Sequence, residues 1–251
     1  MHDEYQGMLA LNYDALYGVM RDPSGDAAFY RSLAEAIGGP LLELGCGTGR
    51  VLLPIARLGI PCVGLDASPA MLSLLRAKNP PANLELVEGR METLAQIPGL
   101  DGRQFRLITC PFRAFQHLLD VPAQLAALAG IHRRLASGGT FALDVFDPKL
   151  AWLIAPGGVE RLDATFVRDG VVTRRFARTS VDLATQTMEI SFRFEPDDGS
   201  GNSSVRLRWF TRYELEHLLA RAGFVEVTVF GGYDQQPWRP EGDTVIVARR
   251  P

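Results

Sequence analysis

One stretch decides the fold of this chain: Leu41-Leu42-Glu43-Leu44-Gly45-Cys46-Gly47-Thr48-Gly49-Arg50. Its apolar first half predicts a buried strand, and the apolar periodicity of residues 50–58 predicts a helix after it. Glycine stands at every second position between the two, so the backbone there can approach a ligand where a Cβ atom would collide. The N-terminus of the helix offers unpaired N–H groups to an anionic group. A G-x-G-x-x-G dinucleotide turn would need glycine where Arg50 stands, so the pattern is G-x-G-x-G with the acid Glu43 ahead of it.

A second acid ends the next predicted strand. Residues 60–65 form an apolar run that is followed by Asp66. A carboxylate at this place can accept hydrogen bonds from both ribose hydroxyls of a nucleoside. Ser68-Pro69 already supplies the N-cap and first position of the following helix, so Asp66 is not needed as its cap. The glycine turn and Asp66 together predict a cofactor that contains a nucleoside.

Strands and helices continue to alternate after this unit. Further strands are predicted at residues 84–87, 105–110, 140–146, 225–230 and 244–248. Helices are predicted between them, among them an amphipathic one at residues 121–135 and one that Thr211 and Glu214 would open as a capping box. This order indicates parallel βαβ units with right-handed crossovers. We therefore expect an α/β fold with a doubly wound, Rossmann-like, seven-stranded sheet.

Residues 160–210 follow a different pattern. Three strand candidates, at residues 171–181, 187–195 and 203–210, alternate apolar with polar side chains and predict a small antiparallel sheet with one apolar face. We divide the chain into an N-terminal helical lid (1–39), a Rossmann-like domain (40–159 and 211–251) and the antiparallel insertion (160–210). The insertion would cover the active site or a subunit interface, in which case the chain forms a homodimer.

Composition excludes several classes of protein. Hydrophobic residues make up 47% of the chain and charged residues 22%, as in ordinary globular proteins. The net charge of −3 gives no attraction to nucleic acid or an anionic membrane. No apolar run approaches the ~20 residues of a membrane span, and no secretory signal is evident. Three scattered cysteines indicate reduced thiols, and no His, Cys, Asp or Glu cluster has metal-binding spacing. We expect a cytoplasmic protein without a metal.

The acid, the glycine turn and Asp66 together resemble the first motifs of the class I S-adenosylmethionine (SAM) dependent methyltransferases. The resemblance implies SAM as cofactor and S-adenosylhomocysteine as product. In that family the corner after the third strand usually reads Gly-Asp-Met, whereas here Arg90 replaces the acid; it can stack on adenine but cannot accept its hydrogen bond. The residues assigned to cofactor binding are Tyr5, Glu43, Gly45, Cys46, Gly47, Gly49, Asp66, Ala67, Gly89, Arg90, Met91 and Cys110.

The segment after the fourth predicted strand, residues 110–118, bears on the acceptor. It lacks the Asn or Asp that nucleic-acid amino methyltransferases place there. It is more similar to the Phe-x-x-(aliphatic or aromatic)-x-His-Leu segment of small-molecule N-methyltransferases, above all those that dimethylate amino sugars. By that resemblance the histidine lies beside the acceptor amine, and tyrosines of an N-terminal helix close over the cofactor. An arginine in this segment would suit a carboxylate or phosphate on the substrate. The predicted catalytic residues are His117, Tyr13, Tyr17 and Arg113.

These residues also allow plainer interpretations. Tyr13 and Tyr17 are four apart, which suits core packing as well as a ligand site. His117 would also fit a structural role in its loop, and Arg113 would fit a solvated one. We nevertheless expect all four, with Tyr5 and the loop at residues 233–238, to converge on one pocket.

The sequence thus predicts a SAM-dependent methyltransferase acting on a small molecule, most simply at an amine nitrogen. An amine has only to lose a proton, and His117 can assist that step. Two alternatives stay open at this stage: metal-free O-methylation with His117 as base, and a SAM-binding protein without catalysis. Formation of S-adenosylhomocysteine with any acceptor would exclude the second.

Overall fold

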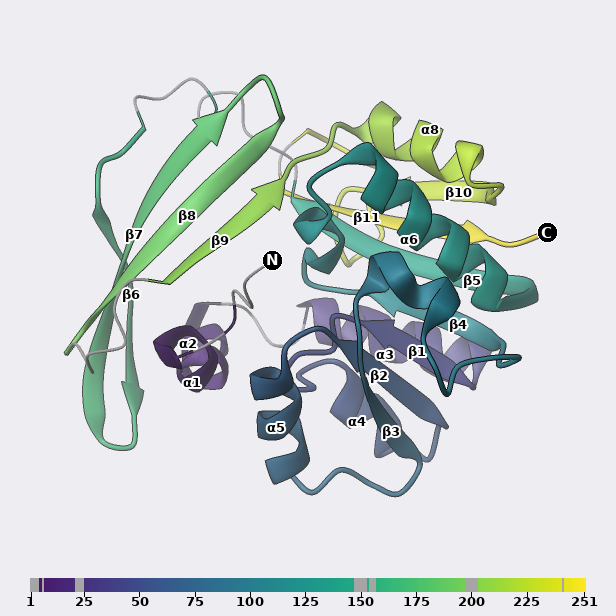
Figure 1. The fold of residues 1–251 in the computed structure, drawn as a ribbon, viewed down its shortest axis with the longest axis horizontal. Coiled ribbons are helices and arrows are strands. Elements are labelled where there is room, and N and C mark those ends of the chain that lie inside the picture. The colour runs from purple at the N-terminus through teal and green to yellow at the C-terminus, as the bar shows by residue number, and fades with distance from the viewer. Residues whose placement is uncertain are drawn as a thin grey trace.

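The computed structural model describes residues 5, 7–20, 25–146, 153, 157–196, 203–240 and 242–251. These residues form a seven-stranded sheet and a separate four-stranded sheet (Figure 1). The sequence also predicts a helix break at residues 22–25 and a turn at residues 197–201, of which 22–24 and 197–201 lie outside the described residues.

The larger sheet has the order β10-β11-β5-β4-β1-β2-β3. Its strands are β1 (Leu41–Leu44), β2 (Cys62–Asp66), β3 (Leu84–Glu88), β4 (Phe105–Cys110), β5 (Leu135–Phe146), β10 (Val225–Phe230) and β11 (Asp243–Arg249). The first five are parallel to one another, while β11 runs antiparallel to both β5 and β10. The strand order reverses direction between β1 and β4, so a crevice opens there at the carboxyl ends of the strands. The predicted doubly wound, seven-stranded α/β sheet is confirmed.

Helices cover both faces of this sheet, which is why its central strands are apolar on both sides. All four residues of β1 are buried. The helices α3 (Gly25–Ile37), α4 (Leu52–Ala56) and α5 (Pro69–Ala77) share one apolar cluster with the sheet. The opposite cluster contains the 3₁₀ helix η1 (Met91–Gln96) and the helices α6 (Val121–Arg134) and α8 (Arg212–Arg221).

The inserted sheet is antiparallel, as predicted, but has four strands where three were expected. Its order is β6-β7-β8-β9, with β6 (Arg161–Arg168), β7 (Val171–Asp182), β8 (Thr187–Glu195) and β9 (Ser203–Arg208). Strand β6 escaped prediction because it buries only Ala164 and Phe166, so its alternation is weak. Ala164 and Phe166 pack against the short helices α1 (Gly7–Leu11) and α2 (Tyr13–Met20), which lie beside this sheet in Figure 1.

Two local predictions need correction. The apolar spacing of residues 5–20 predicts helical structure, and the structure has two helices there, divided at Asn12, whose side-chain amide donates to the Met8 carbonyl oxygen at 2.8 Å. The capping box at Thr211 does not form, since Thr211 makes no side-chain cap bond. Glu214 instead forms an ion pair with the buried Arg208 guanidinium at 2.6 Å. Leaving a buried guanidinium unpaired would cost more free energy than leaving the helix without its cap.

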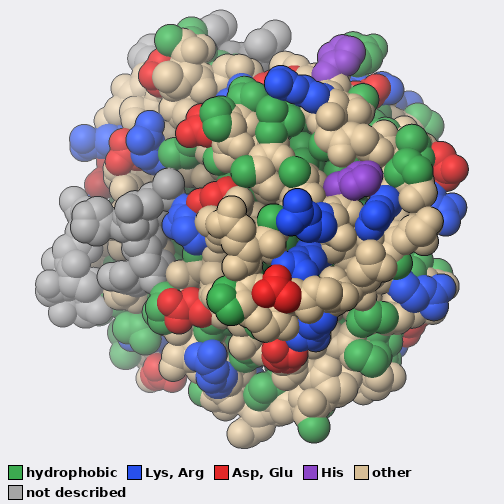
Figure 2. All heavy atoms as spheres, turned by 45° about the vertical axis from the view of Figure 1, so that its right-hand side comes forward, with side chains coloured by type: hydrophobic (Ala, Val, Ile, Leu, Met, Phe, Trp, Pro, Cys, Tyr) green, Lys and Arg blue, Asp and Glu red, His purple; other side chains and the backbone are tan. Residues whose placement is uncertain are grey.

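Within the described part of the chain, none of the helices combines the length and the apolar character that crossing a membrane requires. On the face shown in Figure 2, basic and acidic side chains are interspersed and not segregated by sign.

Candidate active site

The turn after β1 needs its glycines for two reasons. Gly45, Gly47 and Gly49 have φ values of 69°, 53° and 80°, a region that side chains disfavour. A Cβ atom at Gly45 would also lie 2.7 Å from the Cβ atom of Ala114, in the loop after β4. The turn can therefore pass close to that loop only as glycine, and the two together form one side of a cleft.

Asp66 braces this turn from the end of β2. One carboxylate oxygen accepts a hydrogen bond from the Gly47 N–H at 2.7 Å, and the other accepts one from the Ser68 N–H at 2.8 Å. Ser68 caps α5 as predicted, its hydroxyl accepting from the Met71 N–H. Asp66 is thus held by backbone donors while it borders the cleft.

The cleft is a cavity of about 950 Å³ over the carboxyl ends of the strands. That volume is at the upper end of the range for small-molecule sites. Ten of the predicted site residues line it: Tyr5, Tyr13, Gly45, Gly47, Asp66, Ala67, Gly89, Arg90, Met91 and His117. Six others do not border it: Tyr17, Glu43, Cys46, Gly49, Cys110 and Arg113.

His117 lies at the end of the 3₁₀ helix η2 (Ala114–His117). Its Nε2 atom is 3.3 Å from the hydroxyl oxygen of Tyr5, and the two rings meet edge to face. The sequence therefore brings together two residues that are 112 positions apart. This places an imidazole and a phenol at one wall of the cavity that Asp66 also borders.

Aromatic rings from two segments form the adjoining wall. The rings of Tyr13 and Tyr17 are 4.6 Å apart, and Tyr17 meets the ring of Phe112 edge to face at 4.8 Å. Tyr13 is almost fully buried, and burial raises the pKa of its phenol well above the usual value. Tyr17 supports this wall from behind, since it contacts both rings without bordering the cavity.

Helix α2 is attached to the glycine turn by polar contacts. The Asp14 carboxylate accepts a hydrogen bond from the Thr48 hydroxyl at 2.6 Å and lies 2.6 Å from the Lys78 ammonium. The same ammonium donates to the Thr48 carbonyl oxygen at 2.8 Å. These three residues join the N-terminal helices to the turn and to the end of α5.

Two elements expected at the pocket lie elsewhere. Arg113 has a left-handed backbone, so its side chain turns away from the cavity, pairs with Asp243 of β11 at 3.0 Å and covers the Phe146 ring. In the loop at residues 233–238, Tyr233 packs against Phe29 and the Trp238 indole N–H donates to Thr244. The expected convergence of Arg113 and this loop on the pocket is wrong.

The inserted sheet supplies residues that the sequence did not single out. Ser203, Ser204 and Arg206 of β9 also line the cavity. The alternation of β9 places Arg206 on the polar face, where the sequence predicts pairing with an acid across strands, and the register sets it opposite Glu189 of β8. No local signal says which strand of an insertion will meet the site.

Arg90 and Glu92 share the corner after β3. Their side chains form an ion pair at the cavity wall. Glu92 therefore provides a carboxylate at this corner, although the position that usually holds one is occupied by Arg90.

Glu43 lies behind the turn in the middle of β1. It is buried, and its Oε2 atom has no hydrogen-bond partner among the described residues. Burial raises the pKa of this carboxyl to about 8. The folded protein therefore holds a proton that an unfolded chain releases near pH 4.5.

This proton makes stability depend on pH. Between about pH 5 and pH 8 the unfolded chain binds fewer protons than the folded one, so the free energy of unfolding falls as pH rises. We expect Glu43→Gln to remove this dependence. As pH rises from 6 to 8, the free energy of unfolding of Glu43→Gln should increase relative to that of wild type by about 1–2 kcal/mol. Urea unfolding at both pH values measures the difference, with the exposed Glu35→Gln as control. Parallel changes in wild type and Glu43→Gln would contradict the assignment.

Comparisons with known proteins agree with this site. A methyltransferase domain model matches residues 41–139, from the start of β1 into the first half of β5. The cypemycin N-terminal methyltransferase of a Streptomyces species is 28% identical over 236 residues, which are 94% of this chain and 92% of that protein.

Two solved structures match along the whole chain. The CcbJ methyltransferase from Streptomyces caelestis superposes with a TM-score of 0.79 at 26% identity, covering 99% of both chains. SAM-bound CalS10, an amino pentose methyltransferase from Micromonospora echinaspora, superposes with a TM-score of 0.71 at 25% identity, covering 100% of both chains. The strand order, the glycine turn and these similarities identify the chain as a class I SAM-dependent methyltransferase.

Proposed function

We propose that this enzyme transfers the methyl group of SAM to an amine nitrogen of a small molecule. The observation that carries the proposal is the position of His117, which borders the same cavity as Gly47 and Asp66 and lies 3.3 Å from the Tyr5 hydroxyl. A cofactor held at the turn and Asp66 would share this cavity with an acceptor at His117.

The chain's own residues have two tasks in such a reaction. SAM, when bound, supplies an electrophilic methyl group. The cavity walls align the acceptor for an in-line displacement, and alignment of this kind can be worth ~7–11 kcal/mol. The His117 imidazole then takes the proton that the amine must lose, with the Tyr5 hydroxyl fixing the orientation of the ring.

Two comparisons support an amine acceptor. One relative is a cypemycin N-terminal methyltransferase, and one structural neighbour is an amino pentose methyltransferase. Both names indicate an acceptor that contains an amino group, although the molecules that carry it differ. The shared chemistry favours nitrogen over oxygen, and a hydroxyl would also require a stronger base than an amine does.

The part of the cavity lining that comes from β9 favours an acceptor that also carries an anionic group. Arg206 borders the cavity together with Ser203 and Ser204. A guanidinium with two neighbouring hydroxyls suits a carboxylate or a phosphate. Arg206 takes over the role that the sequence suggested for Arg113.

The test is formation of S-adenosylhomocysteine with a panel of primary and secondary amines, each with and without a carboxylate or phosphate, and with the matching alcohols. We expect product from amines and not from alcohols. Arg206→Ala should raise KM about 10-fold for the anionic amines and leave KM for the neutral ones unchanged. Arg161→Ala, an exposed arginine on β6, is the control. Turnover of alcohols alone would contradict the proposal, as would equal effects of Arg206→Ala on both amine sets.

A further inference from the structure

The loop after β4 contains an unusual backbone feature. Phe112 and Arg113 are consecutive non-glycine residues with φ values of 57° and 65°. An L-residue pays sterically for this left-handed conformation, and two in succession occur only where the surroundings enforce them. Something nearby must therefore hold this turn.

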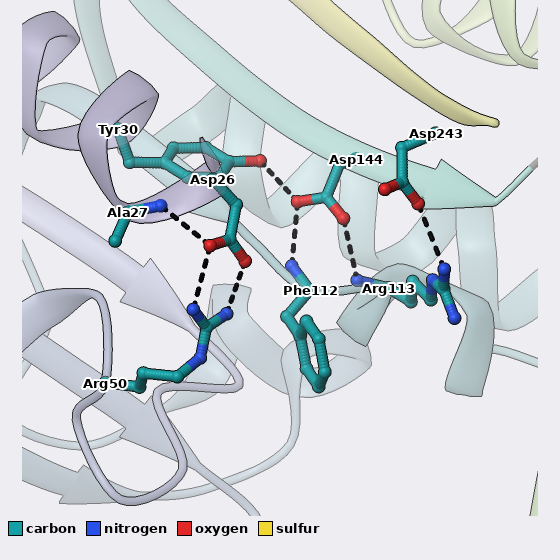
Figure 3. Close-up of polar contacts among 8 residues, drawn as sticks. All are labelled: Asp26, Ala27, Tyr30, Arg50, Phe112, Arg113, Asp144 and Asp243. Carbon is teal, nitrogen blue, oxygen red and sulfur yellow. Dashed lines mark hydrogen bonds and ion pairs between the residues drawn. The ribbon is translucent and has the colours of Figure 1, made fainter. Parts of the chain in front are cut away.

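Asp144 of β5 makes the contacts that hold it. Its carboxylate accepts hydrogen bonds from the N–H of Phe112 at 2.7 Å and from the N–H of Arg113 at 3.2 Å (Figure 3). The left-handed backbone directs both N–H groups to one side, where they form a small anion-binding concavity. The carboxylate also accepts the hydroxyl proton of Tyr30 at 2.7 Å, which fixes its own orientation.

The sheet register explains how the acid reaches this loop. Cys110 at the end of β4 pairs with Leu143, so Asp144 is the first residue of β5 beyond the last β4 partner. The chain leaves the sheet there, and the acid lies under the departing loop with none of its surface exposed. A buried carboxylate is retained in such a place only when donors satisfy it, and here three donors do.

The side chains of the turn are fastened in different directions. The Arg113 guanidinium is fixed to Asp243, while the Phe112 ring faces the Arg50 guanidinium, whose central carbon lies 4.8 Å from the ring centroid. Arg50 is in turn held by an ion pair with the buried Asp26. Figure 3 shows the two ion pairs, Arg113 with Asp243 and Arg50 with Asp26.

Helix η2 begins directly after this turn and ends at His117. Pro111, Phe112, Ala114 and His117 all line the cavity. The conformation of two residues therefore decides where η2 starts, and with it where the imidazole and the Phe112 ring stand relative to an acceptor.

We propose that Asp144, oriented by Tyr30, is a positioning residue that holds the Phe112–Arg113 turn in its left-handed form and so places His117 at the acceptor. The kinetic part of this proposal rests on the proposed function of His117. Asp144 does not touch the cavity, so it acts through the turn.

The test separates backbone positioning from general burial of a polar group. Asp144→Asn puts an amide NH₂ where a carboxylate oxygen faces an N–H donor. One of the hydrogen bonds that hold the turn is then lost, His117 moves from its place, and kcat should fall about 10-fold. Arg113→Gly in that background should restore about fivefold, because glycine adopts a positive φ without steric cost. Arg113→Ala is the matched control, since it removes the same ion pair with Asp243 but keeps a Cβ atom; it should restore nothing.

A second readout does not depend on the acceptor. NMR of the histidine rings, with His117 assigned from a His117→Gln sample, should show its resonances displaced in Asp144→Asn and returned towards wild type by Arg113→Gly but not by Arg113→Ala. If no amine is methylated, the proposed function fails while this readout still decides the positioning role.

Tyr30→Phe gives an independent background should Asp144→Asn not fold. It removes one of the three donors and leaves both N–H bonds, so kcat should fall about threefold, and Arg113→Gly but not Arg113→Ala should reverse the loss. Equal behaviour of the Gly and Ala double variants in both backgrounds would overturn the proposal. Unchanged His117 resonances in Asp144→Asn would overturn it too.

Discussion

The His117→Ala enzyme should turn over an amine acceptor about 10²–10³-fold more slowly than wild type, with SAM affinity changed by less than about threefold. The reason is geometric. His117 is on η2 with the Tyr5 hydroxyl at its Nε2 atom, whereas the contacts that brace the glycine turn come from Asp66 on β2. Removal of the imidazole therefore deletes the proton acceptor and leaves the proposed cofactor side of the cavity as it was.

Steady-state kinetics and calorimetric SAM titration measure the two quantities separately. His217→Ala is the matched control, because His217 is exposed on α8. If His117 only supports its loop, His117→Ala will lower thermal stability, SAM affinity and kcat together. That pattern would contradict a catalytic role.

Asp66→Ala should raise the dissociation constant for SAM about 100-fold, with a smaller effect in Asp66→Asn. The carboxylate has two functions that the alanine cannot replace. It holds the N–H groups of Gly47 and Ser68, and it borders the cavity as an acceptor for ribose hydroxyls. Asparagine keeps one oxygen acceptor, so it should retain part of both functions.

The exposed Asp169→Ala tests whether loss of one negative charge is enough to change binding. It should bind SAM as wild type does. Calorimetry that gives equal SAM affinity for Asp66→Ala and wild type would remove Asp66 from the site.

The features of this molecule that depend on local chemistry were open to prediction. The glycine turn, Asp66 and the Ser68 cap each follow from what a few neighbouring residues can do, and the strand pattern then determines the order of the large sheet. The contact between His117 and Tyr5 does not follow from local chemistry, because it joins segments that are far apart in the sequence. A resemblance to known enzymes, and not spacing, indicated that the two lie near one ligand.

The predictions for Arg113 and Arg206 missed their positions for physical reasons. Arg113 was expected at the pocket from its position in the loop, but its direction is set by a left-handed backbone that Asp144 holds from another strand. Arg206 reaches the cavity because β9 lies against η2, which alternation along β9 cannot show. Asp144 itself had a visible signal: it is a carboxylate within the otherwise apolar residues 141–146.

The attachment of α2 to the glycine turn has a consequence for the timing of catalysis. Asp14, Thr48 and Lys78 join one wall of the cavity to the turn behind it, and the same N-terminal helices pack against the four-stranded sheet. Separation of these contacts would widen the cavity and expose apolar surface, at a cost in free energy. We therefore expect the slow step of the cycle to be the escape of the spent cofactor, so that the N-terminal segment governs its residence time.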